Sequence, residues 1–209
     1  MKDIAPTRII VIHDDIDESY PLIVMLKHKY GAENALFFKH SQKGLEYVLE
    51  NIGQKMIVIL DKNFKDRNDI SGLQVFEKIR ERTILVYVVL ITANSLTDFT
   101  EDELKTLINK DLFRLESFTQ NYQRILELVE EALLTLNLRV DAVIEDWIMR
   151  HPPEKREQIL LKTKEGKSYS MNEILKSIRL QTSIGIDFER NLLKLAIELF
   201  SRQKLKIDG

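Results

Sequence analysis

Short apolar runs alternate with amphipathic segments along the first two thirds of the chain. Met56–Leu60 and Ile84–Ile91 are apolar at every position, and Arg8–Ile12 is rich in β-branched residues. An unbroken apolar run is typical of a strand that is buried on both faces, as in a parallel sheet covered by helices. Two weaker runs, Ala35–Phe38 and Thr106–Asn109, complete a set of five predicted strands.

Amphipathic stretches follow these runs, with apolar residues three or four positions apart. They predict helices over the ranges Glu18–Tyr30, 41–52, 72–79, Asp98–Lys105 and Thr119–Met149. The last helix would be roughly 45 Å long, and a break near Asn137 is the alternative. The alternation of strands and helices predicts an α/β fold with a five-stranded, doubly wound parallel sheet.

The last quarter of the chain predicts a small all-α module. Its expected helices are Glu154–Lys164, a segment that begins at the capping box of Ser170 and Glu173, and Asp187–Lys204. We therefore predict two domains, an α/β domain over residues 1–138 and a helical module over 139–209, joined through the long fifth helix.

Composition excludes several classes of function. The net charge is -2, so the chain has no basic footprint for nucleic acid. Because the chain has no cysteine, disulfides, thiolate catalysis and cysteine zinc sites are excluded. The four histidines lack metal-ligand spacing and are interpreted as structural or surface residues. The N-terminus carries no apolar signal segment, and no apolar run approaches the roughly 20 residues of a membrane helix, so we expect a cytoplasmic protein.

Acidic and polar residues stand where four of the predicted strands end. Asp14 and Asp15 follow the first strand, Asp61 the third, Thr92 the fourth and Lys110 the fifth. The carboxyl ends of parallel strands can converge on one crevice of the sheet. Carboxylates there can hold Mg²⁺, and a lone aspartate beside the metal can attack phosphorus while a hydroxyl and an ammonium group contact the phosphoryl oxygens. The simpler interpretation is that these acids only cap turns and favour the next helix N-terminus.

The motifs IIVIHDD, IVILDKN, SGLQVFEKIR, VVLITA and INKDLF together resemble the receiver domain of two-component response regulators, over roughly Thr7–Leu138. The resemblance implies a flavodoxin-like receiver fold and a phosphoacceptor function in signal transduction. It implies a sensor histidine kinase or phosphotransfer protein as partner. No enzymatic activity is implied beyond Mg²⁺-dependent self-phosphorylation and autodephosphorylation.

The resemblance also assigns a role to each candidate residue. Asp61 would be the phosphorylated residue, Thr92 the switch hydroxyl and Lys110 the lysine of strand five. The implied Mg²⁺ ligands are Asp14, Asp15, Asp61 and the backbone carbonyl of Asn63. Two departures from the family pattern, Asp111 in place of the usual proline and Leu107 in place of an aromatic residue, predict a non-standard output.

Three alternatives remain open. The chain could be a pseudo-receiver that binds partners without phosphorylation. Residues 15–19 fit the D-x-D-x-S/T motif of haloacid-dehalogenase-type phosphohydrolases, although the acidic pair expected after the lysine is missing. A DNA-binding response regulator is the third alternative, but the bases of the last two helices are balanced by acids. We expect output through protein contacts, including a homodimer through the long helix and the C-terminal module, and not through nucleic acid or membrane.

Overall fold

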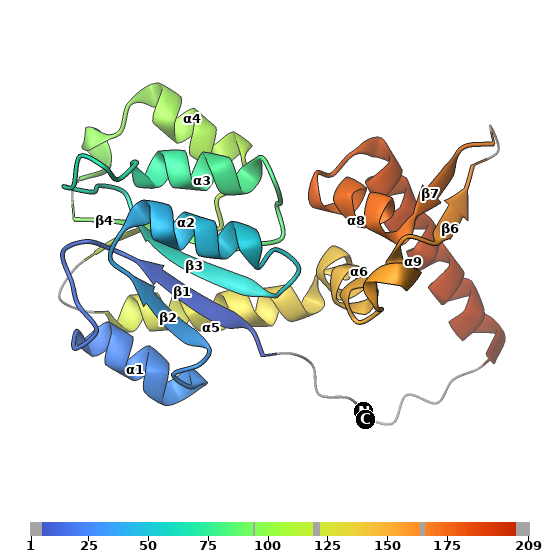
Figure 1. Cartoon of the computed structure of the whole chain (residues 1–209), viewed down its shortest axis with the longest axis horizontal. Coiled ribbons are helices and arrows are strands. Elements are labelled where there is room, and N and C mark those ends of the chain that lie inside the picture. The colour runs from blue at the N-terminus through green and yellow to red at the C-terminus, as the bar shows by residue number, and fades with distance from the viewer. Residues whose placement is uncertain (1–5, 94, 119–121, 164–165, 204–209) are drawn as a thin grey trace. The chain divides into compact units, whose positions relative to one another are not determined.

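The computed structural model describes residues 6–93, 95–118, 122–163 and 166–203 (Figure 1). The backbone divides into two compact units, Met1–Ala142 and Val143–Gly209. The division lies close to the boundary after residue 138 that the sequence predicts.

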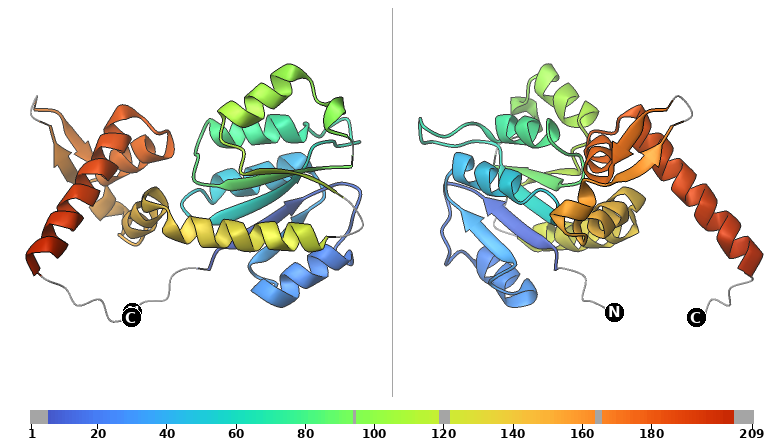
Figure 2. Two further views of the ribbon diagram at one scale, coloured as in Figure 1. Left: turned by 180° about the vertical axis from the view of Figure 1, so that it is seen from behind. Right: turned by 45° about the vertical axis from the view of Figure 1, so that its right-hand side comes forward.

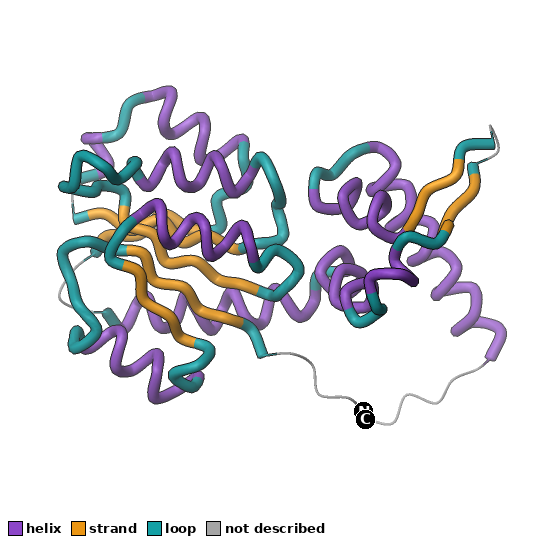
Figure 3. Tube along the Cα trace, in the orientation of Figure 1, coloured by secondary structure: helices purple, strands orange, loops and turns teal. Residues whose placement is uncertain are grey.

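The first unit contains one sheet of five parallel strands in the order β2-β1-β3-β4-β5. Figure 3 shows its strands side by side between helices. The strands are β1 (Arg8–Ile12), β2 (Ala35–Phe38), β3 (Met56–Asp61), β4 (Tyr87–Thr92) and β5 (Arg114–Ser117). The strand order doubles back between β2 and β3, which makes the sheet doubly wound. The predicted fold class is confirmed for this unit.

Helices cover both faces of the sheet, with α1 and α5 on one side and α2, α3 and α4 on the other (Figure 1). Their bounds are α1 (Pro21–Tyr30), α2 (Ser41–Glu50), α3 (Gly72–Arg80), α4 (Glu101–Asn109) and α5 (Gln123–Leu138). Alternate residues of β3 enter opposite cores: Ile57 and Ile59 pack with α1 and α5, and Val58 and Leu60 pack with α2 and α3. A strand with two covered faces needs apolar residues at every position, which explains the unbroken run.

The fifth strand lies later in the chain than the sequence predicts. The range Thr106–Asn109 belongs to α4, which begins at a capping box of Thr100 and Glu103. Leu104 and Leu107 are three residues apart and pack into the core from one face of this helix. The predicted strand is therefore wrong, because the helical spacing outweighs a two-residue apolar run.

The predicted unbroken helix from Thr119 to Met149 is also wrong, and the alternative of a break near Asn137 is confirmed. α5 ends at Leu138 and α6 (Val140–Met149) follows, with Arg139 in an extended conformation between them (φ -76°, ψ 124°). The guanidinium of Arg139 bonds to Asp141 and lies 5.2 Å from the ring of Tyr87. These contacts hold the backbone of Arg139 out of the helix.

The second unit is mainly helical but not all-α. It contains α7 (Pro153–Arg156), β6 (Ile159–Lys162), β7 (Ser168–Ser170), α8 (Met171–Arg179) and α9 (Ser183–Gln203). The predicted helix Glu154–Lys164 is wrong, because its second half pairs with β7 as an antiparallel hairpin. The capping box of Ser170 and Glu173 is present at the start of α8 as predicted. Among the described residues, no helix has the length and apolar character needed to cross a membrane.

Candidate functional site

Asp61 ends the central strand β3 and is only 7% exposed. The backbone at this strand end is held against β4, since Asp61 pairs with Ile91 in the sheet register and the N–H of Lys62 donates to the carbonyl of Ile91 (2.9 Å). α3 begins directly against this strand end, where a Cβ on Gly72 would overlap the carbonyl oxygen of Asp61. The apolar strand and the close approach of α3 therefore fix the Asp61 carboxyl at the carboxyl edge of the sheet.

His13 and Asp14 follow β1 and meet Asp61 at this edge. The Nδ1 atom of His13 lies 3.5 Å from Oδ2 of Asp61 and 3.9 Å from Oδ1 of Asp14. Candidate ligand atoms of the three residues all lie within 4.8 Å of one another. His13 is buried, accepts the backbone N–H of Asp15 at Nδ1 (3.1 Å), and packs its ring 4.7 Å from that of Phe118. The sequence interpretation missed His13 as a site residue, although its position directly before the acidic pair was a usable signal.

Burial dominates the electrostatics of this cluster. It raises the pKa of Asp61 to about 7, and the charges of Asp14 and Asp15 push it in the same direction. The backbone N–H of Asn63, 3.4 Å from Oδ1 of Asp61, opposes the rise. Burial also lowers the pKa of His13, against the pull of the two acids. The cluster therefore holds more acidic oxygens than its positive charge can neutralise.

Asp14 supplies the observation that fits a metal ion. Its Oδ1 atom is buried and accepts no hydrogen bond from the residues that the structure describes. A buried carboxylate oxygen without a donor is costly, and a hard divalent cation would satisfy it. The carboxylates of Asp14, Asp15 and Asp61 and the nearby backbone of Asn63 can supply oxygen ligands of the kind that Mg²⁺ prefers.

Lys65 is a second residue that the sequence interpretation missed. It lies in the loop between β3 and α3, donates its backbone N–H to Oδ2 of Asp14 (2.7 Å), and pairs its ammonium group with Asp15. The hydrogen bond to Asp15 raises the pKa of Lys65 above its usual value. The charged loop directly after Asp61 was the only signal in the sequence.

Thr92 ends β4 and is almost fully buried, one strand away from Asp61. In the sheet register Asp61 pairs with Ile91, and Thr92 pairs with Ser117 of β5. The backbone carbonyl of Thr92 accepts the N–H of Phe118 (2.7 Å). The structure thus brings Thr92 to the same sheet edge as Asp61, as the sequence predicts.

Lys110 does not join these residues. It is the C-cap of α4 and donates to Glu77 (2.9 Å), and its carbonyl accepts the guanidinium of Arg80 (2.8 Å). Arg80 also donates to the carbonyl of Val86, next to the start of β4. Since all five strands are parallel, Lys110 lies at the amino edge of the sheet, opposite Asp61.

The carboxyl end of β5, where the resemblance implies a lysine, is formed by Glu116 and Ser117. Glu116 pairs with Arg124 of α5 at 3.5 Å. The positive charge near the acidic cluster therefore comes from the loop after β3 and not from β5.

The phosphohydrolase motif has a local explanation. Oδ1 of Asp17 accepts the backbone N–H (2.8 Å) and the hydroxyl (2.6 Å) of Ser19, which closes the turn that leads into α1. Asp17 and Ser19 are exposed, and Asp15 is paired with Lys65. The motif here stabilises a turn next to the cluster.

Neither a family model nor a curated protein matches the sequence. Among solved structures, the N-terminal domain of an uncharacterized protein from Wolinella succinogenes is similar, with 14% identity, a TM-score of 0.50, and coverage of 64% of this chain and 99% of that chain. A CheY-like response regulator receiver domain protein from Methanospirillum hungatei is similar too, with 16% identity, a TM-score of 0.51, and coverage of 64% and 98%. At such low identity these likenesses concern the fold alone. The N-terminal unit therefore has the fold of a response regulator receiver domain.

Proposed function

We propose that the N-terminal unit is a Mg²⁺-dependent phosphoacceptor of two-component signal transduction, phosphorylated on Asp61. The observation that carries the proposal is the buried carboxyl of Asp61 beside the unsatisfied Oδ1 of Asp14, at the carboxyl edge of a receiver-type sheet. The donor would be a sensor histidine kinase or a phosphotransfer protein in the cytoplasm. The wider signalling role follows from the fold likeness and is part of this proposal.

In the proposed reaction, a carboxylate oxygen of Asp61 forms a bond to phosphorus. The bond from phosphorus to the donor imidazole nitrogen breaks, and its electron pair leaves with that nitrogen, which then takes up a proton from water. Asp14, Asp15, Asp61 and the carbonyl of Asn63 would hold Mg²⁺. When bound, Mg²⁺ neutralises the charge of the phosphoryl oxygens and the acids.

The hydroxyl of Thr92 and the ammonium group of Lys65 would contact the phosphoryl oxygens. Thr92 follows Ile91, the register partner of Asp61, and Lys65 already pairs with Asp15, so both residues are near the sheet edge at which a group on Asp61 would lie. Their new contacts would favour one of two pre-existing conformations of the sheet edge. Output would then pass to a partner protein.

Intact-mass spectrometry after incubation with acetyl phosphate and Mg²⁺ tests the proposal. The wild type should gain the mass of one phosphoryl group, and Asp61→Asn should not. Asp17→Asn is a matched control, since Asp17 is an exposed acid four residues after His13 that lies outside the cluster. A wild type that stays unmodified with Mg²⁺ present would refute the phosphoacceptor role.

One observation favours a second candidate, a pseudo-receiver that binds partners without phosphorylation. Glu116 and Ser117 stand at the end of β5, where a lysine would assist phosphoryl transfer. In that case Asp61 would remain a buried acid next to His13. Beryllofluoride binding with Mg²⁺ distinguishes the two candidates, because a pseudo-receiver should give no change in the NMR spectrum.

A further inference from the structure

α9 extends well beyond the elements that pack against it (Figure 2). Its N-terminal half lies on α8 so closely that a Cβ on Gly185 would overlap the backbone of Ser177. α8 has only 9 residues, whereas α9 has 21. Among the residues of the second unit that the structure describes, none forms a covering layer over the C-terminal half of α9.

That half is apolar around most of its circumference. Six large apolar side chains are between 39% and 65% exposed: Leu192, Leu193, Leu195, Ile197, Leu199 and Phe200. Together they leave on the order of 500 Å² of apolar surface on one helix, which is as much as a typical monomer keeps in its largest patch. A helix that is apolar on most sides is normally buried.

Four of these six side chains form a stripe centred on Ala196, and Leu195 and Ile197 lie on either side of it. Residues three or four positions away on a helix share a face, which groups Leu192, Leu193, Leu199 and Phe200 around Ala196. Lys194 and Glu198, two positions before and after Ala196, lie on the opposite face. Between Leu192 and Phe200 the charged residues therefore leave one side of α9 apolar.

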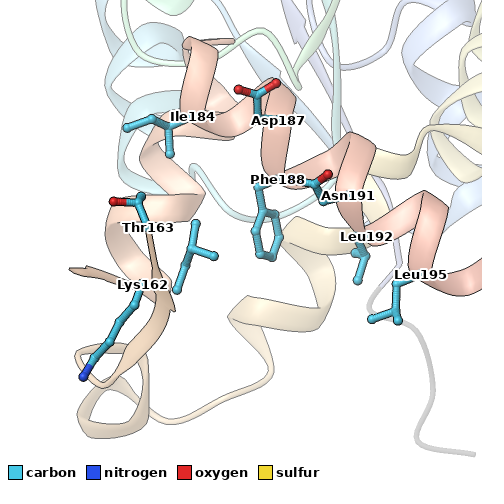
Figure 4. Close-up of a pocket in the computed structure, with 9 residues that line it drawn as sticks. Lys162, Thr163, Ile184, Asp187, Phe188, Asn191, Leu192 and Leu195 are labelled. Atoms are coloured by element: carbon cyan, nitrogen blue, oxygen red, sulfur yellow. The ribbon is translucent and has the colours of Figure 1, made fainter. Parts of the chain in front are cut away.

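An open groove of about 570 Å³ borders this stripe between α9 and β6 (Figure 4). Phe188, Leu192 and Leu195 of α9 and Leu161 of β6 provide its apolar wall. Leu192 belongs to both the groove and the stripe, so the two form one continuous apolar surface.

We infer that the stripe on α9 binds the α9 stripe of a second copy of this chain, antiparallel to it and with a two-fold axis at Ala196. About such an axis, Leu192 and Leu193 of one copy lie level with Phe200 and Leu199 of the other, so apolar residues meet throughout. The small side chain of Ala196 lets the two helices approach closely where they cross.

The size of the surface and the helix dipoles support this arrangement. A stable dimer buries about 800 Å² per partner, and the stripe with its adjoining groove supplies most of that area. In the antiparallel order the dipoles of the two α9 helices point in opposite directions and attract each other, whereas in a parallel order they repel. The inference deepens the output step of the proposed function but needs no phosphorylation of Asp61.

Sedimentation equilibrium of the full chain tests the dimer. The wild type should be dimeric at micromolar concentration, and Ala196→Glu should raise the dimer dissociation constant by roughly 100-fold, because it buries an unpaired charge at the axis. Lys194→Ala, on the opposite face, should remain dimeric. Circular dichroism checks that both variants keep their helices.

Cysteine cross-linking tests whether the two α9 helices are antiparallel. The chain has no cysteine, so only the introduced thiols can form a disulfide. Ala196→Cys should form a disulfide-linked dimer, whereas Lys194→Cys should not. Leu192→Cys should also fail, because in the antiparallel order its two copies lie about 12 Å apart along the axis, too far for a disulfide.

Either of two results would overturn the inference. One is a wild type that is still monomeric at a concentration 100-fold above the micromolar range. The α9 stripe would then bind a different protein. The other is cross-linking of Leu192→Cys as efficient as that of Ala196→Cys, which would indicate a parallel pair. Because Asp61→Asn should sediment like the wild type, failure of the dimer and failure of phosphorylation are separate outcomes.

Discussion

The imidazole Nδ1 of His13 lies 3.5 Å from the carboxyl Oδ2 of Asp61, and both side chains are buried. The sheet register brings this pair together, because Ile12 of β1 pairs with Leu60 of β3, and His13 and Asp61 are the next residues along the two chains. Burial raises the pKa of Asp61 and lowers that of His13, so both groups favour their neutral forms.

Without Mg²⁺, Asp61 should destabilise the fold as the pH rises. Its folded pKa of about 7 exceeds the unfolded value of 3.8, so the folded state binds the proton more tightly. Ionising the buried Asp61 lowers the free energy of unfolding. This loss is absent below pH 4, grows as the pH rises from 4 to 7, and reaches at most about 4 kcal/mol above pH 7. In urea denaturation with EDTA, Asp61→Asn should therefore be more stable than the wild type at pH 8, and the difference should narrow toward pH 4.

The control for this profile is Asp102→Asn, which changes an exposed acid in the first turn of α4. It should follow the wild type at every pH. A constant difference between Asp61→Asn and the wild type from pH 4 to 8 would mean that Asp61 titrates normally in the folded protein.

Mg²⁺ should stabilise the wild type at pH 8. At a concentration about 100 times the dissociation constant, binding to the folded state alone adds about 2.7 kcal/mol. In thermal unfolding, Mg²⁺ should raise the Tm of the wild type. It should change the Tm of Asp14→Asn only slightly, because this variant lacks the carboxylate whose Oδ1 has no donor. An equal Mg²⁺ response in Asp14→Asn would exclude Asp14 as a ligand.

Lys65 and Lys110 form a matched pair for testing which cation serves the site. Lys65→Met should slow modification of Asp61 by acetyl phosphate roughly 10-fold, because it removes the ammonium group next to Asp15. Lys110→Met should leave that rate unchanged and cost at most about 1 kcal/mol of stability, since its ion pair with Glu77 is exposed. If Lys110→Met slowed the modification and Lys65→Met did not, Lys110 would be the residue that reaches Asp61 in solution.

Strands buried on both faces could be predicted from the sequence because their apolar runs fit one interpretation only. Met56–Asp61 is buried at every position, and the sequence identified its terminal aspartate correctly as the residue at the sheet edge. The edge strand Arg114–Ser117 has only two partly buried residues, and the helical spacing of Leu104 and Leu107 next to it gave the stronger pattern. Because the prediction assigns part of α4 to the fifth strand, the predicted end of that strand falls at Lys110.

Contacts between distant parts of the chain could not be predicted from local patterns. Lys65 reaches Asp15 across 50 residues of sequence, and nothing in the loop after Asp61 indicates which of its charged residues turns back to the cluster. The hairpin of β6 and β7 is a similar case. Leu160 and Leu161 fit a helix as well as a strand, and only the pairing with Tyr169 decides between them.

Arg80 should be a main support of the amino edge of the sheet. Arg80 is only 8% exposed, and its guanidinium donates to the carbonyls of Val86 (2.9 Å), Lys110 (2.8 Å) and Asp111 (3.0 Å). Burial lowers the pKa of Arg80 to about 10. Asp111 has a positive φ of 53°, so these bonds also hold a strained turn before β5. Arg80→Met should lower the free energy of unfolding by about 3 kcal/mol, because it leaves the buried carbonyl of Val86 and the partly buried bonds at Lys110 and Asp111 without a donor. Urea denaturation at pH 7 measures the loss, with Arg82→Met, an exposed neighbour, as the control. A loss below about 1 kcal/mol would show that water replaces these bonds and that the amino edge is solvated.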